Sequence, residues 1–158
     1  MQVREIMTRE PACCSPDTKV QEVATMMLEH DCGVIPVVES SGSKRPIGVV
    51  TDRDIAARVV AEGRDPAKTT ARECMTSPVF TVTPDTEVAR CCDILEQHQI
   101  RRVPVVDERG NVCGMIAQAD IATFASERDT AEVVRSISQP SGSSPRMRAT
   151  ERSTSGRL

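Results

Sequence analysis

In two segments of the chain, apolar residues recur three and four positions apart. In the first segment these residues are Val20, Val23, Ala24, Met27 and Leu28, and in the second they are Val88, Cys91, Cys92 and Leu95. Polar and charged residues fill the positions between them. This spacing places the apolar side chains on one face of a helix, so each segment is predicted to be an amphipathic helix.

Each predicted helix is followed by two short, β-branched apolar runs with a polar turn between them. The runs are IPVV and IGVV after the first helix, and VPVV and VCGMI after the second. Apolar runs of this length around a polar turn are typical of a β-hairpin. A further helix is expected after each hairpin, beginning near Asp52 and ending at Gly63 in the first case, and beginning near Asp120 in the second.

The chain therefore contains one β-α-β-β-α unit twice, which predicts an α/β (α+β) fold. At an offset of 68, VREIMT corresponds to ARECMT and SPDT to TPDT, and the offset falls to 66 after the first polar turn. Turns tolerate such length changes better than strands and helices do. We expect repeat 1 over residues 1–66, repeat 2 over 67–128, a terminal helix over 129–139 and a disordered, Ser/Pro/Gly/Arg-rich tail over 140–158.

Composition narrows the class of protein further. Seven cysteines without C-x-x-C spacing, a charged N-terminus and the lack of a long apolar run predict a cytoplasmic protein without disulfides or a membrane span. The net charge is -3, and Trp and Tyr are absent. Acidic character and the lack of stacking side chains argue against nucleic acid as a partner.

No catalytic motif is found in the sequence. It lacks a nucleophile elbow, an HExxH helix, a Walker loop and a GxGxxG turn. We therefore expect no enzymatic activity, no catalytic residues and no catalytic cofactor.

The start of the last helix of each unit carries the most informative motif. GVVTDRD (48–54) corresponds to GMIAQAD (114–120), so the second copy keeps the aspartate but has Ala117 in place of Thr51. Thr51 and Asp54 have the arrangement of a capping box, which satisfies backbone N–H groups at a helix start. Alternatively, Asp54 could accept hydrogen bonds from ribose hydroxyls while Thr51 donates to a phosphate.

With two hydrophobic-Pro-hydrophobic strands and two Gly-hydrophobic-hydrophobic motifs ending in aspartate, residues 1–128 resemble a tandem pair of CBS domains, the Bateman module. The resemblance implies two repeats packed about a pseudo-two-fold axis and a homodimer. It also implies a regulatory module that binds an adenosine-containing ligand (AMP, ATP, NAD or similar) in the cleft between repeats. The module would transmit energy or redox status to a partner protein, which the sequence does not identify.

The resemblance also implies two unequal ligand sites. The better-equipped site would use Thr51 and Asp54 for the phosphate and ribose, with Arg102 and Arg101 reaching the phosphate from the other repeat. Gly33, Cys32 and Cys13 would contact the base. The weaker site would be built on Asp120, because Ala117 and Val34 stand where the first site has Thr51 and Arg102.

Two other functions remain open from the sequence. Vicinal pairs at Cys13-Cys14 and Cys91-Cys92, with His30 and His98 at equivalent positions, are compatible with a metal or redox sensor. Cys91 and Cys92 lie on an apolar helix face, which favours core packing instead, and no metal ligand set is assigned. The other alternative is a dimerisation scaffold without a ligand.

Overall fold

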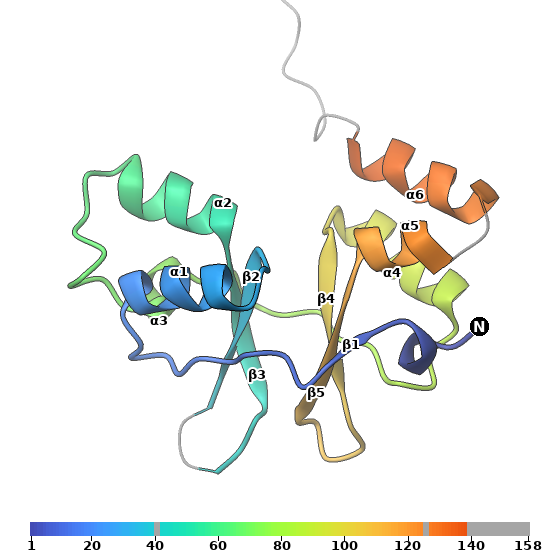
Figure 1. The fold of residues 1–158 in the computed structure, drawn as a ribbon, viewed down its shortest axis with the longest axis horizontal. Helices are drawn as coiled ribbons and strands as arrows, with labels where there is room; N and C mark the ends of the chain where they lie inside the picture. The colour runs from blue at the N-terminus through green and yellow to red at the C-terminus, as the bar shows by residue number, and fades with distance from the viewer. Residues whose placement is uncertain (40–41, 125–126, 139–158) are drawn as a thin grey trace, which may run out of the picture.

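The computed structural model describes residues 1–39, 42–124 and 127–138; the predicted tail at 140–158 lies outside them. Two β-hairpins lie side by side at the centre of the molecule, and helices cover their outer sides (Figure 1). The α+β fold and the duplicated unit predicted from the sequence are confirmed. The boundaries predicted for the repeats stay a prediction.

The first half of the molecule is built around one antiparallel hairpin. Its elements are α1 (Val20–Glu29), β2 (Val34–Val38), β3 (Pro46–Thr51), α2 (Asp52–Ile55) and the π-helical continuation η2 (Ala56–Val60). Gly63 follows with a φ of +68°, a left-handed conformation that glycine adopts at low cost, and its position ends the helix as expected.

The second half repeats this arrangement and adds a helix. Its elements are α4 (Val88–His98), β4 (Arg102–Val106), β5 (Val112–Ala117), α5 (Gln118–Phe124) and α6 (Glu127–Ser138). Helix α6 packs against α4 and α5, and buries Val133 and Ile137 in the core of this half. The corresponding helices of the first half, α1 and α2, have no such cover among the described residues (Figure 1).

The first residues of each repeat cross to the other repeat. Strand β1 (Thr8–Arg9) pairs with β5, and the preceding 3-10 helix η1 (Val3–Glu5) places Val3 in the second core. Likewise, helix α3 (Ala71–Cys74) lies in the first core, and Thr76 pairs with Val49. These crossings join the two halves, because each core is completed by a segment of the other repeat.

The repeat seen in the sequence is also present in the backbone pairing. Cys14 forms a parallel bridge with Val37, and Val82, at an offset of 68, forms one with Val105. Residues at the same offset therefore occupy equivalent places in the two halves.

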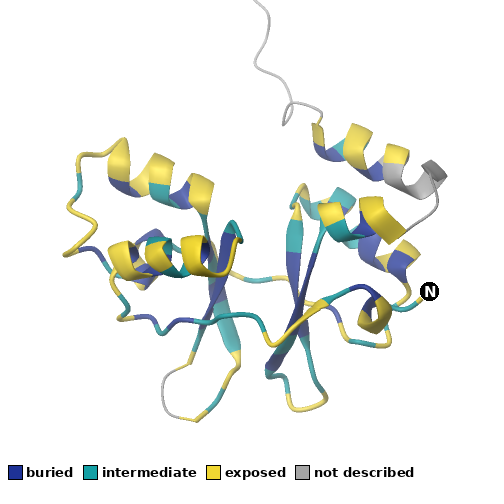
Figure 2. Cartoon of the chain, in the orientation of Figure 1, coloured by how far each residue is buried: buried dark blue, intermediate teal, exposed yellow. Residues whose placement is uncertain are grey.

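The cores consist of aliphatic side chains, methionine and cysteines, and Figure 2 shows where the buried residues lie along the chain. The helix faces that point toward the hairpins are buried and the outward faces are exposed. Leu28 departs from the predicted apolar face of α1, because 84% of its surface is exposed. Cys91 and Cys92 are buried in the second core, which confirms the core-packing interpretation for that pair. Within the described part of the chain, no helix is long and apolar enough to cross a membrane.

Candidate functional site

Asp54 is held by the protein itself. The Thr51 N–H donates to Asp54 Oδ2 (3.0 Å) and the Asp54 N–H donates to Thr51 Oγ1 (3.0 Å), so the capping box is present. Thr76 Oγ1 also donates to both carboxylate oxygens, at 3.1 and 3.3 Å, and the Arg58 guanidinium lies 3.7 Å from Oδ1. Only 8% of Asp54 is exposed. The carboxylate is therefore buried and both of its oxygens have partners.

Asp120 has the equivalent position but fewer partners. Its Oδ2 accepts a hydrogen bond from the Ala117 N–H at 2.7 Å, which is half of a capping box. No hydrogen bond to Oδ1 is found within residues 1–39, 42–124 and 127–138, and the residue is half-buried. The cap explains why the second copy can lose the threonine hydroxyl and still use the aspartate. It also leaves one carboxylate oxygen available to a ligand.

A cavity of about 390 Å³ lies beside Asp120, between the two repeats. From the first repeat it is lined by the end of α1 and the start of β2, and from the second by β5 and α5. The crossing segment at Thr8 to Ala12 forms a further wall. Cavities that bind small molecules have volumes of roughly 300–1,000 Å³ and combine apolar walls with a few polar groups. Here Val34, Met115 and Ala117 supply apolar surface beside the carboxylate.

Arg102 also lines this cavity. A methyl group built on Gly33 would lie 3.0 Å from Arg102 Nη2 and 2.8 Å from Asp52 Oδ2. The guanidinium therefore reaches from the second repeat across to the first, and the lack of a side chain at Gly33 leaves room for it. Arg102 brings a positive charge to the cavity beside Asp120, and it also lines a neighbouring hollow with Asp52 and Ile55. The expectation that it serves the site of Thr51 and Asp54 stays a prediction.

Four of the eight predicted site residues line the cavity: Cys32, Gly33, Arg102 and Asp120. Thr51, Asp54, Arg101 and Cys13 are not among its lining residues, and Arg101 is exposed. The roles of all eight in ligand binding stay predictions. The structure nevertheless separates them into two groups, with Thr51 and Asp54 on one side of the pseudo-symmetric pair and Asp120 on the other.

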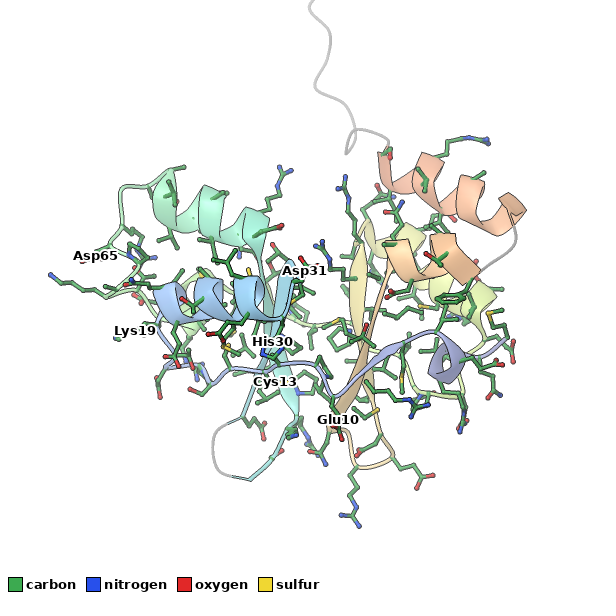
Figure 3. The ribbon with its side chains drawn as sticks, viewed as in Figure 1. Glu10, Cys13, Lys19, His30, Asp31 and Asp65 are labelled. Atoms are coloured by element: carbon green, nitrogen blue, oxygen red, sulfur yellow. The ribbon has the colours of Figure 1, made fainter. Side chains whose placement is uncertain are left out.

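Sequence reasoning missed several residues of the cavity wall. Glu10, His30 and Asp31 line it, and Figure 3 shows His30, Asp31 and Cys13 close together at the inner end of α1, between the repeats. The repeat offset of 68 relates His30 to His98, but it does not indicate that His30 lines a cavity. Glu10 reaches the cavity because the segment at β1 crosses to the second repeat.

A larger hollow of about 740 Å³ lies near the hairpin turns, and three of its charged residues have partners within the protein. Arg4 forms an ion pair with Asp85, and Arg9 donates to the Arg4 carbonyl oxygen. Asp107 Oδ1 accepts from the Arg109 and Asn111 N–H groups. The cavity beside Asp120 is therefore the better candidate for a ligand site.

Comparison with known proteins decides the family. The CBS domain profile matches residues 3–61 and 71–127. The chain belongs to the CBS domain family. Proteins of this family are typically regulatory and non-catalytic.

Several CBS relatives are similar over most of their length. The CBS domain-containing protein YhcV of Bacillus subtilis is 38% identical over 129 residues, covering 82% of this chain and 89% of YhcV. The crystal structure of Hypoxic Response Protein I with two coordinated zinc ions has a TM-score of 0.71, with 32% identity, and the match covers 80% of this chain and 100% of that one.

Two similar structures contain adenosine compounds. A CBS domain protein of Pyrobaculum aerophilum complexed with AMP has a TM-score of 0.73 and 27% identity, covering 85% of this chain and 99% of that one. The CBS domain pair of protein MJ0100, in complex with 5′-methylthioadenosine and S-adenosyl-L-methionine, has a TM-score of 0.71 and 27% identity. That match covers 80% of this chain and 100% of the other.

The cysteines of this CBS pair are mostly structural. Burial raises the pKa of the Cys14 and Cys91 thiols to about 12, and it also raises the pKa of Cys13 and Cys74 above the usual value. A protonated thiol is a poor nucleophile and a poor metal ligand. Among the described residues, no group of three or more His, Cys, Asp and Glu side chains could hold a metal ion.

We expect Cys14 and Cys91 of the native protein to react slowly with a thiol reagent at pH 7.5, and to react at once in denaturant. The reason is that their thiolate forms are suppressed only while they are buried. The measurement is a colorimetric thiol assay followed by mass spectrometry of labelled peptides, with all seven cysteines labelled in denaturant as the control. Fast native labelling of Cys14 and Cys91 would contradict this assignment and favour the redox alternative.

Proposed function

We propose that this CBS pair is a regulatory module whose cavity beside Asp120 binds an adenosine-containing ligand. The observation that carries the proposal is the cavity itself, which joins both repeats and contains a carboxylate oxygen that has no hydrogen-bond partner among the described residues. A carboxylate can accept hydrogen bonds from the vicinal hydroxyls of a ribose. The AMP and 5′-methylthioadenosine complexes of similar CBS pairs support adenosine as the common part of the ligand.

The walls of the cavity fit the other parts of such a ligand. Val34, Met115 and Pro11 offer apolar surface for a flat base. Arg102 offers a guanidinium that can donate to a phosphate or another acceptor at the 5′ position. AMP, ATP and 5′-methylthioadenosine are the compounds to test, because all three contain adenosine and they differ in the group at the 5′ position.

Ligand binding would act on the relative arrangement of the repeats. Arg102 and Asp120 come from the second repeat, whereas Asp31 and Gly33 come from the first. A ligand that contacts all of them stabilises one arrangement and shifts the population of the chain toward it. In this proposal a homodimer in the cytoplasm presents that arrangement to a separate partner protein, and the partner reads the level of the adenosine compound.

The proposal is tested by Asp120→Asn, which we expect to weaken adenosine binding about tenfold or more. Charge-assisted hydrogen bonds contribute roughly 1.5–3 kcal/mol, and the amide removes the charge. The amide oxygen can still accept from the Ala117 N–H, so the variant keeps the helix cap. The measurement is isothermal titration calorimetry with AMP and with 5′-methylthioadenosine.

Asp17→Asn is the matched control, because Asp17 is an exposed carboxylate in a loop away from the cavity. It should leave the affinity unchanged. If wild type binds none of the adenosine compounds, or if the two variants bind equally well, the cavity does not serve as the ligand site. The ligand-free scaffold would then be the better interpretation.

A further inference from the structure

Besides the motif itself, the two sides of the molecule differ where Ala12 of the first repeat corresponds to Phe80 of the second. Ala12 and His30 line the cavity beside Asp120. At an offset of 68 their counterparts are Phe80 and His98, whose rings are stacked with centroids 3.6 Å apart and an interplanar angle of 16°. A small side chain thus stands on the open side, where the other side has an aromatic ring.

The backbone places these residues equivalently. Cys14 and Val82 form corresponding parallel bridges with Val37 and Val105, and Ala12 and Phe80 each lie two residues earlier in the chain. His30 follows α1 directly and His98 ends α4. Phe80 therefore stands, on the side of Thr51 and Asp54, at the position that Ala12 has in the wall of the cavity beside Asp120.

The carboxylates of the two clefts follow the same division. On the Phe80 side, Thr76 Oγ1 donates to both oxygens of Asp54. On the open side, the counterpart of Thr76 is Thr8, which lines the cavity, and Asp120 accepts only from the Ala117 N–H among the described residues. On the Phe80 side, a ring of the protein thus stands where the other side has Ala12. The Thr76 hydroxyl contacts the carboxylate there without using all of its roughly four acceptor positions.

We propose that Phe80 is a built-in plug of a second, latent adenosine site formed around Thr51 and Asp54. The inference deepens the proposed function and rests on it, since it assumes that the equivalent open cleft takes an adenosine compound. Two rings at a stacking distance leave no room for a third between them, so a base can enter only when Phe80 moves away from His98. Phe80 is 39% exposed, so its ring has solvent on one side into which it can turn.

A plug at Phe80 explains how the repeat with the complete Thr51 and Asp54 motif can be closed while the other repeat is open. Thr51 and Asp54 retain both the hydroxyl and the carboxylate that the second copy has only in part. Wild-type protein should therefore bind one adenosine ligand per chain, in the cavity beside Asp120, and keep the complete motif in reserve.

The reciprocal variants Phe80→Ala and Ala12→Phe test the inference. Titration of the full chain with AMP and with 5′-methylthioadenosine should give a stoichiometry of about one for wild type and about two for Phe80→Ala. Ala12→Phe places a ring beside His30, in the space that the base would occupy. The affinity of this variant for the adenosine compound should therefore fall about tenfold or more. Far-ultraviolet circular dichroism and thermal unfolding establish that both variants are folded, and Phe80→Val replaces Phe80→Ala if the latter is not.

Proton NMR gives a readout that needs no ligand. The chain has two histidines, so the ring protons of His30 and His98 are resolved and assignable with one His→Gln variant. Stacking on Phe80 shifts the His98 signals upfield relative to those of His30. Phe80→Ala should remove that shift, and Ala12→Phe should create one at His30.

The outcomes separate the two proposals. If wild type and Phe80→Ala both bind about one ligand with equal affinity, the plug is wrong and the open site stands. A lower affinity in Phe80→Ala would also overturn the plug, because the ring would then be part of the binding surface. If Phe80→Ala alone binds, the plug is supported and the proposed open site fails; if neither binds, both proposals fail.

Discussion

Asp54→Ala is expected to lower the free energy of unfolding by about 2–4 kcal/mol. The substitution leaves the half-buried Thr51 N–H without its acceptor, and a buried donor that loses its partner costs roughly 1–3 kcal/mol. The exposed Thr76 hydroxyl loses its hydrogen bond to the carboxylate as well, but it can bond to water instead. It also removes a carboxylate from the first turn of α2, where the helix dipole favours a negative charge. Urea unfolding followed by circular dichroism measures the change.

Asp120→Ala is the matched control for this prediction. It removes one hydrogen bond at a half-buried helix start, so its cost should be about 1 kcal/mol. The two aspartates should therefore have different main roles. Asp54 should contribute more to the free energy of unfolding, and Asp120 should contribute more to ligand affinity. An equal loss of stability in the two variants would contradict this division of roles.

Leu95→Ala is expected to lower the free energy of unfolding by about 2–5 kcal/mol. Leu95 is fully buried in the second core, and truncation to alanine loses its transfer free energy and leaves a cavity. The second core also receives Val3 from the N-terminal segment and Val133 from α6, so the cavity would weaken the contacts of both.

Leu28→Ala provides the control, because Leu28 lies on α1 with 84% of its surface exposed. The same chemical change should cost at most about 0.5 kcal/mol there. Comparable losses in both leucine variants would show that the exposed face of α1 is covered in solution. Gel filtration and dilution of the wild-type protein would then identify the oligomer responsible.

The sequence was sufficient for the hairpins and most of the helices. Short apolar runs on either side of a polar turn specify a hairpin locally, and the spacing of Val20, Val23 and Met27 specifies the buried face of α1. The capping box at Thr51 and Asp54 was also readable, since it involves residues three apart on one helix start.

The crossing of segments between repeats was not readable from these patterns. Val3 and Ala71 are apolar in a local pattern that would fit either core. Which core each residue joins depends on contacts with residues that are distant in the sequence. The consequence reaches the site, because the crossing at β1 is what brings Glu10 and Ala12 to the cavity.

The ranking of the two clefts also depends on three-dimensional contacts. A threonine and an aspartate in a motif do not show which site is open, because both oxygens of Asp54 already have partners in Thr51, Thr76 and Arg58 while Asp120 has fewer among the described residues. The sequence has Ala12 in the first repeat where the second repeat has Phe80. Its stacking on His98 became apparent only from the structure.

The most direct test of the central claim is a crystal structure of the full chain grown with AMP or 5′-methylthioadenosine. The account predicts the adenosine in the cavity beside Asp120, with the ribose hydroxyls within hydrogen-bond distance of Asp120 Oδ1 and with Phe80 still stacked on His98. An adenosine bound against Thr51 and Asp54 with the cavity beside Asp120 empty would contradict it.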